Sequence, residues 1–200
     1  MRKKLITAII ALSLVLSCMV GITVAWLFVE TDEVTNVFTP SDITLKLDET
    51  KNKFQMVPGV DIAKDPKVTV KADFDAYVFV KIVENGTVTV TENNVSTTYT
   101  FDDFLSYALA DGWTVLEGTY DTNDSNSGNE TVVIYRTQAA TTAEVTYSVL
   151  AGDKVTTNTS VTKQMMNAYT DGSIKLTFTA YAIQQTGFAD AEAAWEELNK

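Results

Sequence analysis

The stretch Tyr77-Val-Phe-Val-Lys-Ile-Val83 is a nearly continuous apolar run that only Lys81 interrupts. It is short and rich in β-branched residues, which pack well on a pleated surface. Such a run is typical of a strand that is buried on both faces, near the centre of a sheet. The run therefore predicts a β-rich fold built around residues 77–83.

Alternating apolar and polar residues on either side of this run predict further strands with one buried face. The clearest examples are Ile43 to Asp48, Val68 to Lys71 and Ile174 to Thr179. Asn85-Gly86 follows the run directly and predicts a hairpin turn, because this dipeptide favours the positive φ angles of a tight turn. The whole chain has 30 threonines and 23 valines, which supports a strand-rich fold.

Three stretches follow helical spacing instead. Residues 102–110 predict a helix capped by Asp102 or Asp103, and Lys163 to Ala168 predict a helical turn. Asp190 predicts the start of a terminal helix whose apolar stripe is Ala191, Ala194, Trp195 and Leu198. Eight to ten strands with two or three short helices in the connections predict a mainly β fold, a two-sheet, jelly-roll-like sandwich.

The N-terminus has the features of an export signal. Arg2, Lys3 and Lys4 precede an uncharged run from Leu5 to Val29. Small residues before position 26 predict signal-peptidase cleavage between Ala25 and Trp26. The predicted organisation is a signal helix over 1–25, an N-terminal arm over 26–38 and a single β-sandwich domain over 39–200.

Two other interpretations of the N-terminus stay open. The uncharged run is long enough to span a bilayer, so it could remain as a membrane anchor. Leu16-Ser17-Cys18 has some features of a lipoprotein site, although Leu16 is bulkier than such sites prefer. Each interpretation places residues 30–200 outside the cytoplasm, so we expect an exported protein that is secreted or held at the cell surface.

Charge and composition exclude several functions. The chain has 26 acidic and 15 basic residues, a net charge of −11, one cysteine and no histidine. The negative charge argues against a nucleic-acid partner. The absence of histidine removes His-based catalysis and a His-ligated zinc, and we expect no cofactor. The acidic loop 121–130 could offer oxygen ligands to Ca²⁺, but positions 126 and 132 lack the Gly and Glu of an EF-hand, which favours a solvated loop.

The arm over residues 26–38 combines aromatic and aliphatic side chains with three acidic ones. It could be a first strand that packs in its own sandwich. It could instead be a donor strand that completes the sheet of a neighbouring copy, and head-to-tail donation of this kind generates fibres. The side chains that would carry the donation are Trp26, Phe28, Val34, Val37 and Phe38.

The segment Ala25-Trp-Leu-Phe-Val-Glu-Thr-Asp-Glu-Val-Thr-Asn-Val-Phe-Thr39 resembles the junction of exported proteins that the signal peptidase SipW processes. Val57-Pro58-Gly59, the stretch from Lys64 to Val68 and the run from Ala76 to Lys81 resemble the turn and strands that follow in that group. The ending from Thr179 to Gln184 is also similar. These stretches together resemble the TasA and camelysin-like family of biofilm matrix proteins.

The resemblance implies a jelly-roll sandwich, export through a SipW-type signal peptidase in a Gram-positive host, and assembly into extracellular fibres by N-terminal strand donation. The partners would be further copies of the chain and related matrix subunits. The metalloprotease activity described for camelysins does not carry over, because no His-Glu-x-x-His motif is present. We therefore expect a structural protein and no enzyme. The alternatives are a monomeric surface adhesin or binding module, free or anchored by an uncleaved N-terminal helix, and a carboxylate-based hydrolase with a deep acidic cleft.

Overall fold

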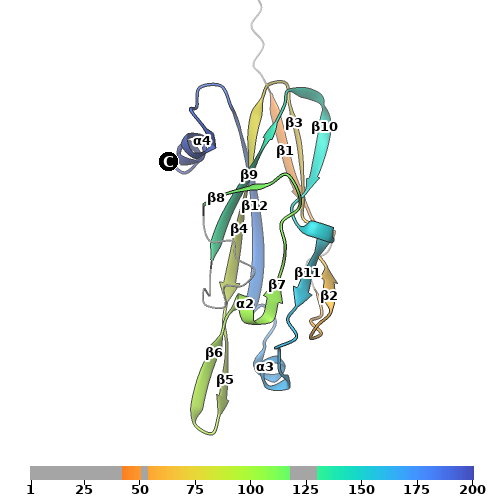
Figure 1. Cartoon of the computed structure of the whole chain (residues 1–200), viewed down its shortest axis with the longest axis vertical. Coiled ribbons are helices and arrows are strands. Elements are labelled where there is room, and N and C mark those ends of the chain that lie inside the picture. Colours follow the sequence, from red (N-terminus) through yellow and green to blue (C-terminus); the bar gives the residue numbers. More distant parts are fainter. Residues whose placement is uncertain (1–41, 51–53, 118–129) are drawn as a thin grey trace, which may run out of the picture. The chain divides into compact units, whose positions relative to one another are not determined.

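The fold was analysed in a computed structural model that describes residues 42–50, 54–117 and 130–200. The chain divides into two compact units, Met1–Thr39 and Pro40–Lys200, and every described residue belongs to the second. This unit is mainly β, with antiparallel sheets and a few short helices, which confirms the predicted fold class (Figure 1). The predicted signal helix, cleavage site and arm lie outside the described residues.

The central sheet has four strands in the order β12-β4-β9-β8. Strand β4 (Ala76–Gly86) pairs along its whole length with β12 (Ile174–Gln184) and on its other side with β9 (Thr131–Gln138), and β8 (Thr114–Glu117) completes the sheet. Side chains of β4 are buried on both faces, including Val78, Phe79 and Val80, each fully buried. The apolar run at residues 77–83 is therefore a central strand, as predicted.

A second sheet packs against one face of the first and has the order β1-β3-β10. Its strands are β1 (Ile43–Asp48), β3 (Lys67–Ala72) and β10 (Thr141–Ser148). Val68 and Val70 of β3 are fully buried and share one core with Val80 and Ile82 of β4. This layered arrangement is consistent with the predicted β-sandwich, and the jelly-roll connectivity stays a prediction.

Smaller elements cover the ends of the core. A third sheet joins β2 (Asp61–Ala63), β11 (Lys154–Thr157) and β7 (Leu105–Ser106). The 3₁₀ turn η1 (Ala151–Asp153) precedes β11, and α3 (Lys163–Ala168) has the predicted bounds. Twelve strands are present in the described residues, more than the eight to ten predicted, and β2 and β7 are among the shortest.

The opposite face of the central sheet is covered by α4 (Ala191–Leu198). Asp190 caps this helix as predicted, since its Oδ1 accepts a hydrogen bond from the Ala193 N–H at 2.9 Å. Trp195, one residue of the predicted apolar stripe, is buried, and the centroid of its ring lies 5.3 Å from that of the Phe79 ring. The central sheet therefore has apolar packing on both faces. No helix in the described part of the chain is long and apolar enough to cross a membrane.

The hairpin prediction at Asn85-Gly86 is wrong. Gly86 still belongs to β4 and pairs with Ile174, and the next strand, β5 (Val88–Glu92), pairs with β6 (Val95–Tyr99) instead of β4. The turn of this hairpin is Asn93-Asn94, with φ angles of 50° and 64°. Two positive φ angles are what a tight two-residue turn needs, and asparagine tolerates them.

The helix predicted over 102–110 is also wrong in extent. Helix α2 is one turn, Phe101–Phe104, and Leu105 continues in extended conformation into β7. Both phenylalanines are fully buried, so their helical spacing was a correct signal for this turn. The cap is Thr100, whose N–H donates to the Asp103 carboxylate at 2.7 Å, in place of either predicted aspartate. Pairing of β7 with β11 stops the helix, because it takes the backbone groups of the next turn.

Candidate functional site

The residues predicted for cleavage and strand donation all lie outside the described residues, namely Ala25, Trp26, Phe28, Val34, Val37 and Phe38. The described residues instead show which edges could accept a strand. In this part of the chain, β12 and β8 end the central sheet, and β1 and β10 end the second sheet. An edge strand presents a row of N–H and C=O groups that can pair with another chain.

Strands β1 and β12 lie alongside each other without pairing, and we call this flank of the sandwich the β1–β12 side. Ile174 at the start of β12 is buried, but seven other apolar residues in the core-facing rows of the two strands are only half-buried. They are Ile43, Leu45 and Leu47 on β1, and Leu176, Phe178, Ala180 and Ala182 on β12. The corresponding rows of β3 and β4 are almost completely buried. The core is thus incompletely covered on this flank.

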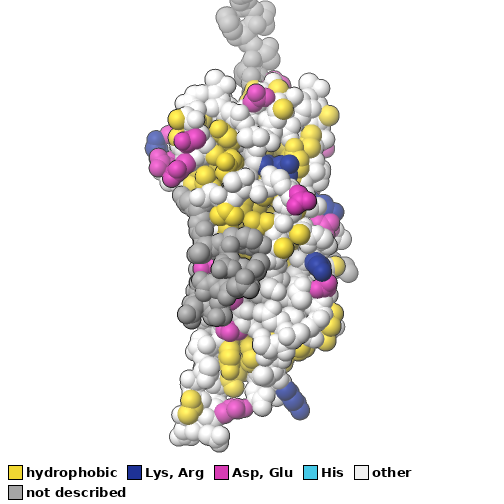
Figure 2. Space-filling model, viewed as in Figure 1, with side chains coloured by type: hydrophobic (Ala, Val, Ile, Leu, Met, Phe, Trp, Pro, Cys, Tyr) yellow, Lys and Arg dark blue, Asp and Glu magenta, His cyan; other side chains and the backbone are white. Residues whose placement is uncertain are grey.

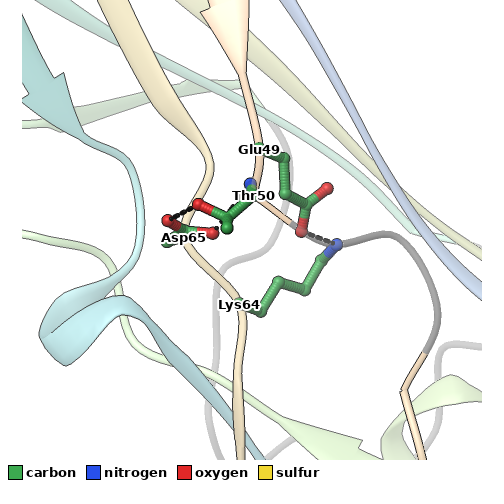
Figure 3. Close-up of polar contacts among 4 residues, drawn as sticks. All are labelled: Glu49, Thr50, Lys64 and Asp65. Carbon is green, nitrogen blue, oxygen red and sulfur yellow. Dashed lines mark hydrogen bonds and ion pairs between the residues drawn. The ribbon is translucent and has the colours of Figure 1, made fainter.

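A buried lysine closes part of the β1–β12 side (Figure 3). Lys64 is 9% exposed, and its Nζ donates to Oε1 of Glu49 at 2.6 Å. The same Nζ lies 5.1 Å from the centroid of the Phe54 ring and 5.2 Å from that of Phe178, within the range of cation–π attraction. Lys64 therefore joins the segment after β2 to β12 and to the residue that follows β1.

The end of β1 is fixed by two further hydrogen bonds, which Figure 3 also shows. Thr50 donates to the Asp65 carboxylate through its hydroxyl at 2.6 Å and through its backbone N–H at 3.1 Å. These bonds hold the pKa of Asp65 below its usual range, because they favour the charged carboxylate. Together with Lys64 and Glu49, they tie the end of β1 to the segment between β2 and β3.

The opposite flank, which we call the β8–β10 side, is closed by Arg136 on β9. Its guanidinium carbon lies 3.5 Å from the centroid of the Tyr147 ring on β10 and 5.3 Å from that of Trp113, just before β8. The Trp113 indole N–H donates to the Ser148 carbonyl at 2.8 Å, and the Tyr147 hydroxyl donates to Gln138. One cation thereby joins β9 of the central sheet, β10 of the second sheet and the segment before β8.

Sequence reasoning missed both cation clusters. Lys64 and Phe178 are more than a hundred positions apart, and Trp113 precedes β8, whereas Arg136 is on β9. One signal was available for the second cluster, since Arg136 is the only arginine after Arg2 and follows the apolar run of β9. A charged residue that continues an apolar strand is often placed against aromatic rings.

The surface between these two flanks carries both apolar and acidic side chains. Figure 2 shows hydrophobic side chains in separate patches, interleaved with acidic ones. Val57, Val60 and Val95 are among the exposed large hydrophobic residues, at 52%, 48% and 65%. Within the described ranges, no group of three or more acidic or cysteine side chains is arranged to hold a metal ion.

Comparison with known proteins finds no relative of this chain. No protein-family model, no curated protein and no solved structure matches the chain.

Proposed function

We propose that the chain is a secreted structural protein of the cell surface or biofilm matrix, and that it assembles into fibres by N-terminal strand donation. The arm over residues 26–38 of one copy would pair with the free edge of β12 in the next copy. The observation that carries this proposal is the half-buried apolar row of the β1–β12 side, next to an edge of eleven residues that pairs with no strand among the described residues.

The dimensions of the two partners agree. An extended arm of thirteen residues covers roughly 43 Å, which is enough to follow all eleven residues of β12. Backbone hydrogen bonds to the β12 edge would supply affinity. Side chains alternate between the two faces of a strand, so Trp26, Phe28, Val34 and Phe38 would share the face that buries the row left half-exposed by β1 and β12, and Val37 would lie on the other face.

Charge would set the conditions for assembly. After cleavage at Ala25 the chain would carry a net charge of −14, because three basic residues are lost with the signal. Like-charged copies repel each other, and salt screens this repulsion over about 10 Å at 0.1 M ionic strength. We therefore expect assembly to be faster at raised salt.

The first experiment compares chains that start at Trp26 and at Pro40, by size-exclusion chromatography and negative-stain electron microscopy across salt concentrations. Fibres with a regular axial repeat are expected only from the longer chain. If the longer chain is a monodisperse monomer in every condition, the fibre proposal fails and the adhesin alternative takes its place.

The second experiment locates the acceptor edge. Residues 26–200 contain no cysteine, so introduced cysteines are unambiguous. A copy with Thr35→Cys, which would lie on the face of the arm opposite to Val34, is mixed with a copy carrying Thr179→Cys, at an exposed position on the corresponding face of β12. The matched control is Thr114→Cys, which is also exposed but lies on β8, the opposite edge of the same sheet. Disulfide-linked dimers are expected with Thr179→Cys, and dimers formed only with the control would move the acceptor site to β8.

A further inference from the structure

Glu84 is a carboxyl group inside the core-facing row of β4. It follows Val80 and Ile82 on the same face and is 5% exposed. The Tyr107 hydroxyl donates to its Oε1 at 2.7 Å. Its other oxygen, Oε2, is buried and accepts no geometrically sound hydrogen bond among the described residues, and the Asp102 carboxyl lies close enough to share a proton with the protonated Glu84. A buried carboxylate oxygen without a donor is costly, whereas a protonated one is much less so.

The charged groups that act on Glu84 are acidic. Glu130 lies beside it at the start of β9, where the Glu84 N–H donates to the Glu130 carbonyl at 2.9 Å. Asp102 acts on it from α2, and Tyr107 contacts it from the segment after β7. On β12, the residue paired with Glu84 is the uncharged Leu176. No element packed around Glu84 in the described residues brings a cation to it.

We propose that Glu84 is a proton-controlled latch at the corner where α2 and the segment up to Tyr107 pack against the end of β4. In its neutral form Glu84 holds α2 against β4, and its ionisation weakens the packing of this corner. The geometry carries the proposal, because a third negative charge would be buried between Asp102 and Glu130 with one oxygen unsatisfied.

The direction of the pH effect follows from the environment of the group. Burial raises the pKa of Glu84 to about 7 against the opposing Tyr107 hydrogen bond, and the charges of Asp102 and Glu130 add to the rise. An open corner would return the carboxyl to its ordinary value of 4.5. A raised carboxyl pKa means that the closed corner is most stable below pH 4.5, loses stability as the pH rises to about 7, and is constant above that.

The corner is also the root of the β5–β6 hairpin, which extends past the end of the central sheet (Figure 1). One strand leaves the sheet at Gly86, where φ is +110° and a Cβ would lie 1.8 Å from the Ser173 carbonyl oxygen. The other strand returns through Thr100 into α2. The Phe101 ring packs edge-on against Tyr107, with centroids 6.2 Å apart. The latch therefore controls how firmly both ends of the hairpin are held.

The test measures hydrogen exchange of the full-length chain in mild detergent between pH 4.5 and 8, corrected for intrinsic exchange rates. Peptides over residues 100–107 report the corner, and peptides over β12 serve as the internal reference. The opening constant of the corner should rise by roughly 150-fold across this range, because a pKa difference of about 2.5 corresponds to a full factor of roughly 300 and half of the open-state carboxyl is already ionised at pH 4.5. Glu84→Gln keeps the shape and an acceptor for Tyr107, and it should remove the rise.

Carbon-13 NMR of the Glu84 carboxyl in the unsubstituted chain gives a second measurement that does not depend on a variant. A midpoint near 7 supports the latch. Glu130→Gln is the matched control, and it should lower that midpoint while leaving the corner closed. A midpoint near 4.5, or an equal pH response of the wild type and Glu84→Gln, would overturn the proposal.

Discussion

On the β1–β12 side the closing cation is Lys64, and on the β8–β10 side it is Arg136. Both cations lie against two aromatic rings that come from distant parts of the chain. The flanks differ in what surrounds the cation. The β1–β12 side keeps seven half-buried apolar side chains along two edges, whereas the core-facing row of β10 has two, Val145 and Tyr147, and Tyr147 lies against the Arg136 guanidinium.

The two flanks show that the edge of a sandwich has two separate requirements, a stable junction between the sheets and a covered strand edge. A cation between rings stabilises the junction of two sheets without covering the edge backbone. An apolar row beside a free edge, in contrast, leaves apolar surface exposed to water that a further strand could bury. The β8–β10 side thus leaves fewer half-buried apolar side chains than the β1–β12 side does.

The largest expected effect is on assembly. Leu45 and Val145 are matched positions, because each pairs with Val70 of β3, one from β1 and the other from β10. Leu45→Lys places a charge in the apolar row and should abolish fibres in negative-stain images. Val145→Lys adds the same charge on the other flank and should leave fibres intact. Equal loss in both variants would mean that the flanks do not differ in the way described.

A smaller effect is expected from the lysine cluster. Lys64→Ala leaves Glu49 without its partner in a largely buried site, and it should lower the free energy of unfolding by about 3 kcal/mol in urea titrations. Lys64→Met combined with Glu49→Gln removes both charges and keeps the volume, so it should recover most of the loss. If the double variant is as unstable as Lys64→Ala, the ion pair is not the cause.

The arginine cluster should contribute less, since Arg136 has no ion pair among the described residues. Arg136→Ala should lower the free energy of unfolding by about 2 kcal/mol, through loss of the stacking on Tyr147 and Trp113. Arg136→Lys should recover only part of it, because a compact ammonium does not stack as a planar guanidinium does. Full recovery with lysine would contradict a role for stacking.

The smallest effect is expected at Asp65, whose carboxylate accepts both Thr50 bonds. Asp65→Asn should lower the melting temperature slightly at pH 7. A lowered carboxyl pKa gives stability that is present above the ordinary value of 3.8 and lost as the pH falls below it. The melting temperatures of the two proteins should therefore converge in acid, and a constant gap across pH would show that ionisation of Asp65 is not involved.

Local patterns predicted most of the strands. The apolar run at residues 77–83 and the alternation at Ile43 to Asp48 became β4 and β1, and the Asp190 cap with its apolar stripe became α4. These signals succeed because period and capping depend on neighbours in sequence.

The errors arose where distant strands decided the outcome. Asn85-Gly86 is a strong local turn signal, yet pairing with β12 extends β4 through both residues. Leu105 continues a helical pattern, yet pairing with β11 draws it into β7. Tertiary pairing overrode local preference in both cases. The candidate site could not be predicted for the same reason, because Lys64 meets Phe178 only after the sheets have formed.

The pairing of β1 has a mechanical consequence. Residues 26–38 lead into β1 at Ile43, and β1 pairs antiparallel with β3 in six consecutive positions, from Ile43 opposite Ala72 to Asp48 opposite Lys67. Tension applied at Ile43 along the strand axis would load these positions in shear, all at once, and would not peel them apart singly. The Thr50–Asp65 bonds lie beyond the far end, so the load would reach them last. In the proposed fibre, β1 would carry the force between one copy and the next.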